Sequence, residues 1–204
     1  ARQPSLRMLA VNLAPSERGG RDRLVFDFRD LLEKRNQTAI YVTHDQEEAF
    51  VIADRVIIMN AGRIAQIGTP QQIYRQPSCR FVANFLGLGN QVAGQIDQRE
   101  SHSIVKTEIG DFSISHGEQT GEVTVLLRPD SVELGERGEQ QLTGNVEEVT
   151  FRGSASKVRL SIAGHHFSFN FPSNTDLPAK GERVTISFNP KEAIQIFPEE
   201  CLEE

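Results

Sequence analysis

The first third of the chain alternates between helix-like and strand-like hydrophobic patterns. Over residues 21–35 apolar side chains recur at a helical spacing with charged residues between them, which predicts an amphipathic helix. The apolar members are Leu24, Val25, Phe28, Leu31 and Leu32. The run 38–43 follows directly and is rich in β-formers, which predicts a strand buried on both faces of a mainly parallel sheet. This order of elements is typical of an α/β layer.

A turn from strand to helix is predicted directly after this run. Asp45 can cap a new helix with Glu48 three residues later, in a capping-box-like arrangement. We expect Glu47 and Glu48 to be solvated carboxylates that suit the start of a helix. His44 then lies on the turn itself, where open α/β sheets place functional side chains.

Further along, residues 55–67 predict a β-hairpin around the three-residue turn Asn60-Ala61-Gly62, in which Gly62 can take a left-handed conformation. Thr69 predicts the cap of a short helix that ends before Pro77, and residues 80–86 predict a second one. Gly87-Leu88-Gly89-Asn90 breaks this pattern. We therefore assign residues 1–88 to one domain and residues 89–204 to another.

The second domain has the texture of an all-β fold. Short strand candidates are separated by Gly, Asp, Asn and Pro, and residues 166–171 alternate so that one row of phenylalanines would be buried. This spacing predicts a small barrel or sandwich. The candidates are 91–96, 102–107, 111–115, 123–128, 142–151, 156–162, 165–171, 184–188 and 193–197.

Composition and charge narrow the classes of function. The 204 residues are 38% hydrophobic, enough to bury a core, and no apolar stretch approaches the roughly 20 residues of a membrane span. Residues 1–88 carry 12 basic and 9 acidic side chains (+3), and residues 89–204 carry 10 and 19 (−9), which together give the net −6. The acidic second half and the absence of Trp argue against nucleic-acid binding. Cys79 and Cys201 stand far apart, which suggests neither a zinc site nor a disulfide framework and fits a reducing cytoplasm.

Several strings, in order, resemble the end of the nucleotide-binding domain of an ABC ATPase. They are Tyr41-Val42-Thr43-His44-Asp45-Gln46-Glu47-Glu48-Ala49, Ala53-Asp54-Arg55, Gly62-Arg63-Ile64 and Gly68-Thr69-Pro70. Two further strings are similar to segments of the ATPases that serve the importers for maltose, polyamines, sulfate and ferric iron. They are Phe81-Val82-Ala83-Asn84-Phe85-Leu86-Gly87 and Leu127-Arg128-Pro129-Asp130. The resemblance implies the carboxyl-terminal α/β part of a P-loop NTPase domain, followed by an all-β, OB-like barrel known as a TOBE domain.

The same resemblance implies a function. It gives His44 the role of the switch histidine, which contacts the γ-phosphate or the attacking water in a dimeric site that uses ATP and Mg²⁺. It also implies a second ATPase subunit and transmembrane permease subunits as partners, with a periplasmic or extracellular solute-binding protein as an indirect one. The expected location is cytoplasmic, peripheral to the inner face of the cell membrane.

The sequence departs from the family pattern at the nucleotide site. The G-x-x-x-x-G-K-[ST] phosphate loop does not occur, and the magnesium-binding aspartate and the catalytic glutamate of the family fall on Ala10 and Val11. Three explanations stay open: a shortened gene product, a partial polypeptide, or a sequence assigned uncertainly over residues 6–20. On each of them we expect this chain alone to bind no cofactor and to hydrolyse no ATP.

Two other readings concern the second domain. A stand-alone oxyanion-binding or regulatory module would use basic strand residues, which are more often solvated; the candidates are Arg128, Arg152, Lys157 and Arg159. A metal site would draw on histidines, but no Cys or close carboxylate completes a ligand set, and adjacent histidines on a strand point to opposite faces. The histidines in question are His102, His116, His165 and His166.

Overall fold

The computed structural model describes residues 7–8, 18–35, 38–98, 103–114 and 120–198. These residues form two compact units, Ala1–Ser78 and Cys79–Glu204. The boundary lies before the one we assigned from sequence, because the helix that precedes Gly87 belongs with the second unit. One contact of this helix across the 88/89 boundary agrees with this: Gln91 Nε2 donates to Asn84 Oδ1 over 3.0 Å.

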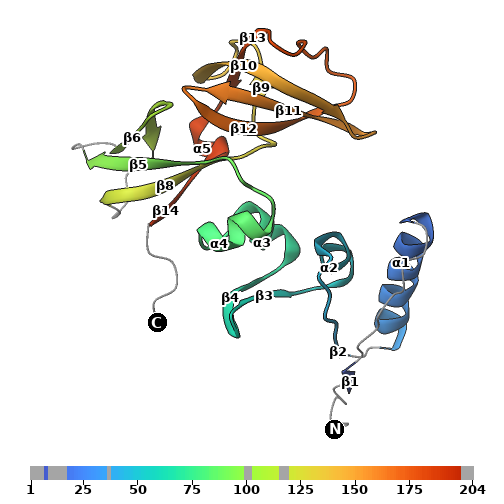
Figure 1. Ribbon diagram of the computed structural model, residues 1–204. Helices are drawn as coiled ribbons and strands as arrows, with labels where there is room; N and C mark the ends of the chain where they lie inside the picture. Colours follow the sequence, from blue (N-terminus) through green and yellow to red (C-terminus); the bar gives the residue numbers. More distant parts are fainter. Residues whose placement is uncertain (1–6, 9–17, 36–37, 99–102, 115–119, 199–204) are drawn as a thin grey trace. The chain divides into compact units, whose positions relative to one another are not determined.

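The first unit contains helices and short strands (Figure 1). Its elements are β1 (Arg7–Met8), α1 (Arg18–Arg35), β2 (Ala39–Ile40), α2 (Gln46–Ile52), β3 (Val56–Asn60), β4 (Arg63–Gly68) and α3 (Pro70–Arg75). β1 and β2 pair in parallel, and β3 and β4 form an antiparallel hairpin. Thr69 caps the start of α3, as the sequence predicted, and Gln72 completes a capping box with it.

The strand predicted over 38–43 is shorter and more exposed than expected. Only Ala39 and Ile40 are in strand conformation, and Ile40 and Val42 are 46% and 71% exposed. Among the described residues β2 pairs only with the two residues of β1, so the expectation of burial on both faces is wrong for this structure. The hairpin turn is also tighter than predicted: Asn60 pairs with Arg63, and Ala61 (φ 47°) and Gly62 (φ 81°) form a two-residue turn of the kind that matches strand twist.

The second unit is a short helix followed by two antiparallel sheets. Its elements are α4 (Arg80–Phe85), β5 (Gln91–Gln98), β6 (Ser103–Thr107), β7 (Gly110–Ile114), β8 (Gly121–Leu127), β9 (Glu133–Leu134), β10 (Gln140–Phe151), β11 (Ala155–Ile162), β12 (His165–Pro172), β13 (Arg183–Phe188), α5 (Pro190–Ala193) and β14 (Ile194–Pro198). The strand orders are β12-β11-β10-β13-β9 and β14-β8-β5-β6-β7, and Figure 1 shows the two sheets with α5 between β13 and β14.

The two sheets share one hydrophobic core. The predicted row of phenylalanines on β12 is confirmed, with Phe167, Phe169 and Phe171 at most 3% exposed. Phe112 of β7 and Phe188 of β13 join the two sheets, with ring centroids 5.9 Å apart. The prediction of an all-β second domain therefore holds. In the described residues the pairings give two open five-stranded sheets over one core, rather than a single closed ring of strands.

Candidate functional site

His44 lies on the bend between β2 and α2, and its side chain is exposed. The helix that follows begins at once because Asp45 caps it, as predicted. Asp45 Oδ1 accepts the backbone N–H groups of Glu47 at 2.9 Å and Glu48 at 3.3 Å. An exposed imidazole directly before a capped helix can reach a ligand, while the capped helix holds its backbone in place.

The polar network behind His44 departs from the sequence expectation. Glu48 is 8% exposed, and its Oε2 accepts hydrogen bonds from Tyr41 Oη at 3.1 Å and Thr43 Oγ1 at 2.9 Å. It is therefore not the solvated carboxylate that we expected. The capping box is also not reciprocal, because the N–H of Asp45 donates to Thr43 Oγ1 at 3.0 Å. Glu48 thus ties the residues before His44 to the helix after it.

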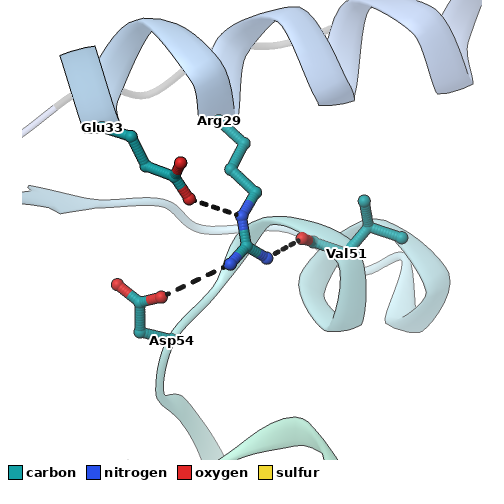
Figure 2. Close-up of polar contacts among 4 residues, drawn as sticks. All are labelled: Arg29, Glu33, Val51 and Asp54. Carbon is teal, nitrogen blue, oxygen red and sulfur yellow. Dashed lines mark hydrogen bonds and ion pairs between the residues drawn. The ribbon is translucent and has the colours of Figure 1, made fainter.

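Arg29 links α1 to the C-terminal end of α2 (Figure 2). Its Nη1 donates to the carbonyl of Val51 over 2.7 Å, and its Nε donates to Glu33 Oε1 over 3.0 Å. Nη2 lies 3.7 Å from Asp54 Oδ1, just beyond α2. A cation at the end of a helix satisfies a terminal carbonyl and suits the helix dipole. α2 is therefore held at its start by Asp45 and at its end by Arg29.

The acidic-pair positions of the resemblance, Ala10 and Val11, lie outside the described residues. In the sequence neither side chain carries an oxygen or nitrogen that could bind Mg²⁺ or polarise a water. Among the described residues no three His, Cys, Asp or Glu side chains gather as a metal site.

The basic residues considered for an oxyanion site take separate positions. Arg128 is 7% exposed, so the expectation of a solvated strand residue is wrong for it, and its Nε lies 3.4 Å from Asp130 Oδ1. Arg159 Nη2 lies 3.0 Å from Glu148 Oε2, and Arg152 is exposed. Neither these three nor Lys157 lines the open groove of about 550 Å³ that the described residues form over β5, β6 and β8.

The histidines of β12 each contact one carboxylate. His165 Nε2 lies 2.5 Å from Glu108 Oε2, and His166 Nδ1 lies 2.8 Å from Glu147 Oε2. His102 and His116 lie outside the described residues. Glu108 and Glu147 contact different histidines, and among the described residues neither pair gathers a third metal ligand. No helix in the described ranges combines the length and hydropathy needed to cross a membrane.

Comparison with known proteins gives one domain match and several relatives. Residues 125–196 match the TOBE domain. The chain is 38% identical to the Fe(3+) ions import ATP-binding protein FbpC of Streptomyces avermitilis, over 93% of this chain and 54% of that protein. It is 33% identical to the spermidine/putrescine import ATP-binding protein PotA of Lawsonia intracellularis, over 91% and 55% respectively. A sulfate/thiosulfate import ATP-binding protein, CysA 2 of Chromobacterium violaceum, is 36% identical over 80% and 45%.

The chain therefore spans about half the length of the curated relatives it matches. Among solved structures, a crystal structure of the cytoplasmic molybdate-binding protein ModG with molybdate bound is 14% identical. The match covers 60% of this chain and 99% of that one, with a TM-score of 0.41.

The sequence did not indicate the structural roles of two residues that build the site. Arg29 sits in the charged part of the helical pattern, and nothing in that pattern distinguishes it from its charged neighbours. Glu48 was noticed only as a cap partner. A Tyr and a Thr shortly before an acid at the start of a helix are the signal that could have indicated its burial, since both hydroxyls need an acceptor once they are partly buried.

Proposed function

We propose, on the premise that this chain is homologous to the ATP-binding subunits of ABC importers and carries a TOBE domain at residues 125–196, that it supplies the switch histidine and the accessory domain of such a subunit. The first unit, Ala1–Ser78, would be the carboxyl-terminal α/β part of a P-loop NTPase domain. The second unit, Cys79–Glu204, would be an accessory domain with a regulatory and dimerising role.

The observation that carries this proposal is the setting of His44. The side chain is exposed, it directly precedes a helix capped by Asp45, and the buried Glu48 fixes the segment before it. A histidine that contacts a phosphate needs an exposed side chain and a positioned backbone. His44 is exposed, and hydrogen bonds of Thr43 and Asp45 hold the residues on either side of it. The string that surrounds it is the one on which the family resemblance rests.

In the proposed site His44 has one chemical task. Its imidazole would donate a hydrogen bond to a γ-phosphate oxygen, or hold the attacking water in line, as negative charge develops on the transferred phosphoryl group. Thr43, Asp45 and Glu48 would act indirectly by fixing where the imidazole stands. Bound Mg²⁺ would neutralise phosphate charge, but the described residues contain no set of ligands for it, and Ala10 and Val11 offer none. We therefore assign no step of the reaction through the metal to this chain.

The remaining features of the proposal follow from the same premise. The residues that bind the phosphates and the metal would come from segments other than these 204 residues. The complete site would be shared with a second ATPase subunit. Transmembrane permease subunits would be the direct membrane partners, with a solute-binding protein acting through them. The subunit would act at the cytoplasmic face of the membrane.

A chimera tests the proposal. Residues 18–204 are joined behind the amino-terminal half of the Streptomyces avermitilis relative, which is kept through its own acidic pair up to the residue that aligns with Glu17. We expect the chimera to show Mg²⁺-dependent ATPase activity, because the relative supplies the phosphate loop and this chain supplies His44. His44→Ala should reduce the activity about 10²- to 10³-fold, the usual loss for one donor to a transition-state oxygen.

The matched control is Glu47→Ala, which removes an exposed side chain three residues further on and should leave the rate within a factor of two or so. If His44→Ala and Glu47→Ala retain equal activity in an active, folded chimera, His44 is not a switch residue. A chimera that folds, binds ATP and has no activity with His44 intact would likewise count against the proposal.

A further inference from the structure

In the part of the chain that the structure describes, β12 is the last strand of its sheet, so one of its edges has no neighbouring strand. Its partner is β11, with His165 opposite Ile162 across the two-residue turn and the pairs continuing to Pro172 opposite Ala155. In an antiparallel pair every second residue directs its N–H and C=O towards the partner, and the residues between direct theirs outward. In β12 the outward set is made up of residues 166, 168, 170 and 172. Such a row is a template on which another chain can add a strand.

The side chain of Asn90 closes the middle of this row. Its Oδ1 accepts the N–H of Ser168 over 2.7 Å, and its Nδ2 donates to the carbonyl of Ser168 over 2.7 Å. A carboxamide presents the same donor and acceptor as a peptide group, so Asn90 occupies the place that a residue of an added strand would take. Asn90 is 4% exposed, and its own carbonyl accepts the N–H of Leu127 over 2.8 Å, which anchors it in the other sheet.

The next outward positions along β12 are satisfied within the chain as well. The N–H of Asn170 donates to the carbonyl of Pro129 over 2.8 Å. Pro172 has no N–H to offer, and its carbonyl accepts the N–H of Thr175 over 3.0 Å. Three consecutive outward residues are thus engaged, and Asn90 is the one side chain among these partners that mimics a strand. We infer that Asn90 is an edge guard, which keeps β12 from pairing with the β12 edge of a second copy of this chain.

This inference predicts a specific change on substitution. Asn90→Ala uncovers Ser168, beside the outward residue His166, while Asn170 and Pro172 keep their partners within the chain. Two copies related by a two-fold axis can then pair antiparallel with residue 166 of each copy opposite residue 168 of the other. Asn90→Ala should therefore raise self-association of the 204-residue chain, measured by light scattering over a concentration series, by at least tenfold over the parent. The amide of Ser168 should exchange with solvent at least tenfold faster in dilute, monomeric samples. Asn90→Asp retains one acceptor but places an anion beside the Ser168 carbonyl, and it should behave like Asn90→Ala.

Two controls separate edge closure from simple loss of stability. Val158→Ala opens a cavity in the fully buried middle of β11 and leaves Asn90 untouched, so it should destabilise the unit without raising self-association. Ser168→Pro, added to Asn90→Ala, removes the outward N–H on an edge strand, where proline is tolerated, and should abolish the new association. The inference is overturned if Asn90→Ala associates no more than Val158→Ala, or if the added proline leaves the association unchanged. Asn90 would guard this edge whether or not His44 serves a nucleotide site.

Discussion

Replacing Glu48 tests the polar network that positions His44. Glu48→Ala removes the acceptor shared by Tyr41 Oη and Thr43 Oγ1, at 3.1 and 2.9 Å, from a side chain that is only 8% exposed. Hydrogen bonds to a charged group contribute about 1.5–3 kcal/mol each. The desolvation of the carboxylate that the variant relieves offsets part of this. We therefore expect the free energy of unfolding of the first unit to fall by about 2–4 kcal/mol.

The chain carries a convenient probe for this measurement. It has two tyrosines and no tryptophan, and both Tyr41 and Tyr74 lie in the first unit. Tyrosine fluorescence during urea unfolding therefore reports on that unit alone, without a contribution from the β-rich unit. The midpoint, rather than the baseline, is the quantity to compare, because Tyr41 itself loses a hydrogen-bond acceptor in the variant.

Two further variants decide how the result is interpreted. Glu48→Gln keeps an acceptor of similar shape without the charge, and it should lose only about 1 kcal/mol. Glu47→Ala removes the exposed neighbouring carboxylate and should stay within about 0.5 kcal/mol of the parent. If Glu48→Ala unfolds at the same urea concentration as Glu47→Ala, the network does not stabilise the turn, and the claim that Glu48 fixes the His44 backbone is refuted.

Three other predictions use the same chain. Arg29→Ala should lower the free energy of unfolding of the first unit by about 1–2 kcal/mol, because the hydrogen bond to the Val51 carbonyl is lost. Lys34→Ala removes an exposed ion pair with Asp30 and should change that free energy by less than about 0.5 kcal/mol. Tyrosine fluorescence during urea unfolding measures both. Gly144→Ala places a methyl group 2.6 Å from the backbone oxygen of Ser161 and should lower the free energy of unfolding of the β-rich unit by at least about 2 kcal/mol. The added methyl group of Gly89→Ala meets nothing within 4 Å, so this variant should be near neutral. Unfolding followed by circular dichroism compares the two. A clean preparation of the printed 204 residues should show no Mg²⁺-dependent ATPase activity, because the phosphate loop does not occur in them; turnover well above background would contradict this.

The sequence predicts most of the second unit because strand alternation is a local signal. The phenylalanine row of β12 could be assigned from period two alone, and burial of that face follows once a second layer exists. β9 and α5 were missed because β9 has two residues and α5 has four, and such short elements depend on tertiary partners. Leu134 of β9, for example, is in strand conformation opposite Ile186 of β13.

The site is harder to predict because its key property is burial of a charged residue. His44 and the Asp45 cap follow from local chemistry and were assigned correctly to the turn and the helix start. The burial of Glu48 depends on Tyr41 and Thr43 turning their hydroxyls towards it, and the place of Arg29 depends on how α1 meets α2. Both are tertiary contacts, on which helical periodicity carries no information. The exposure of Val42 likewise depends on which segments cover β2, not on the β-propensity of the run itself.

The most direct test of the central claim is the split between binding and turnover in the chimera with the Streptomyces avermitilis relative. ATP affinity and single-turnover hydrolysis are measured for the parent chimera and for His44→Ala. If His44 contacts the γ-phosphate or the attacking water, the hydrolysis rate falls about 10²- to 10³-fold while ATP affinity changes by less than about fivefold. An unchanged single-turnover rate in His44→Ala would contradict the assignment of this chain's histidine to the nucleotide site.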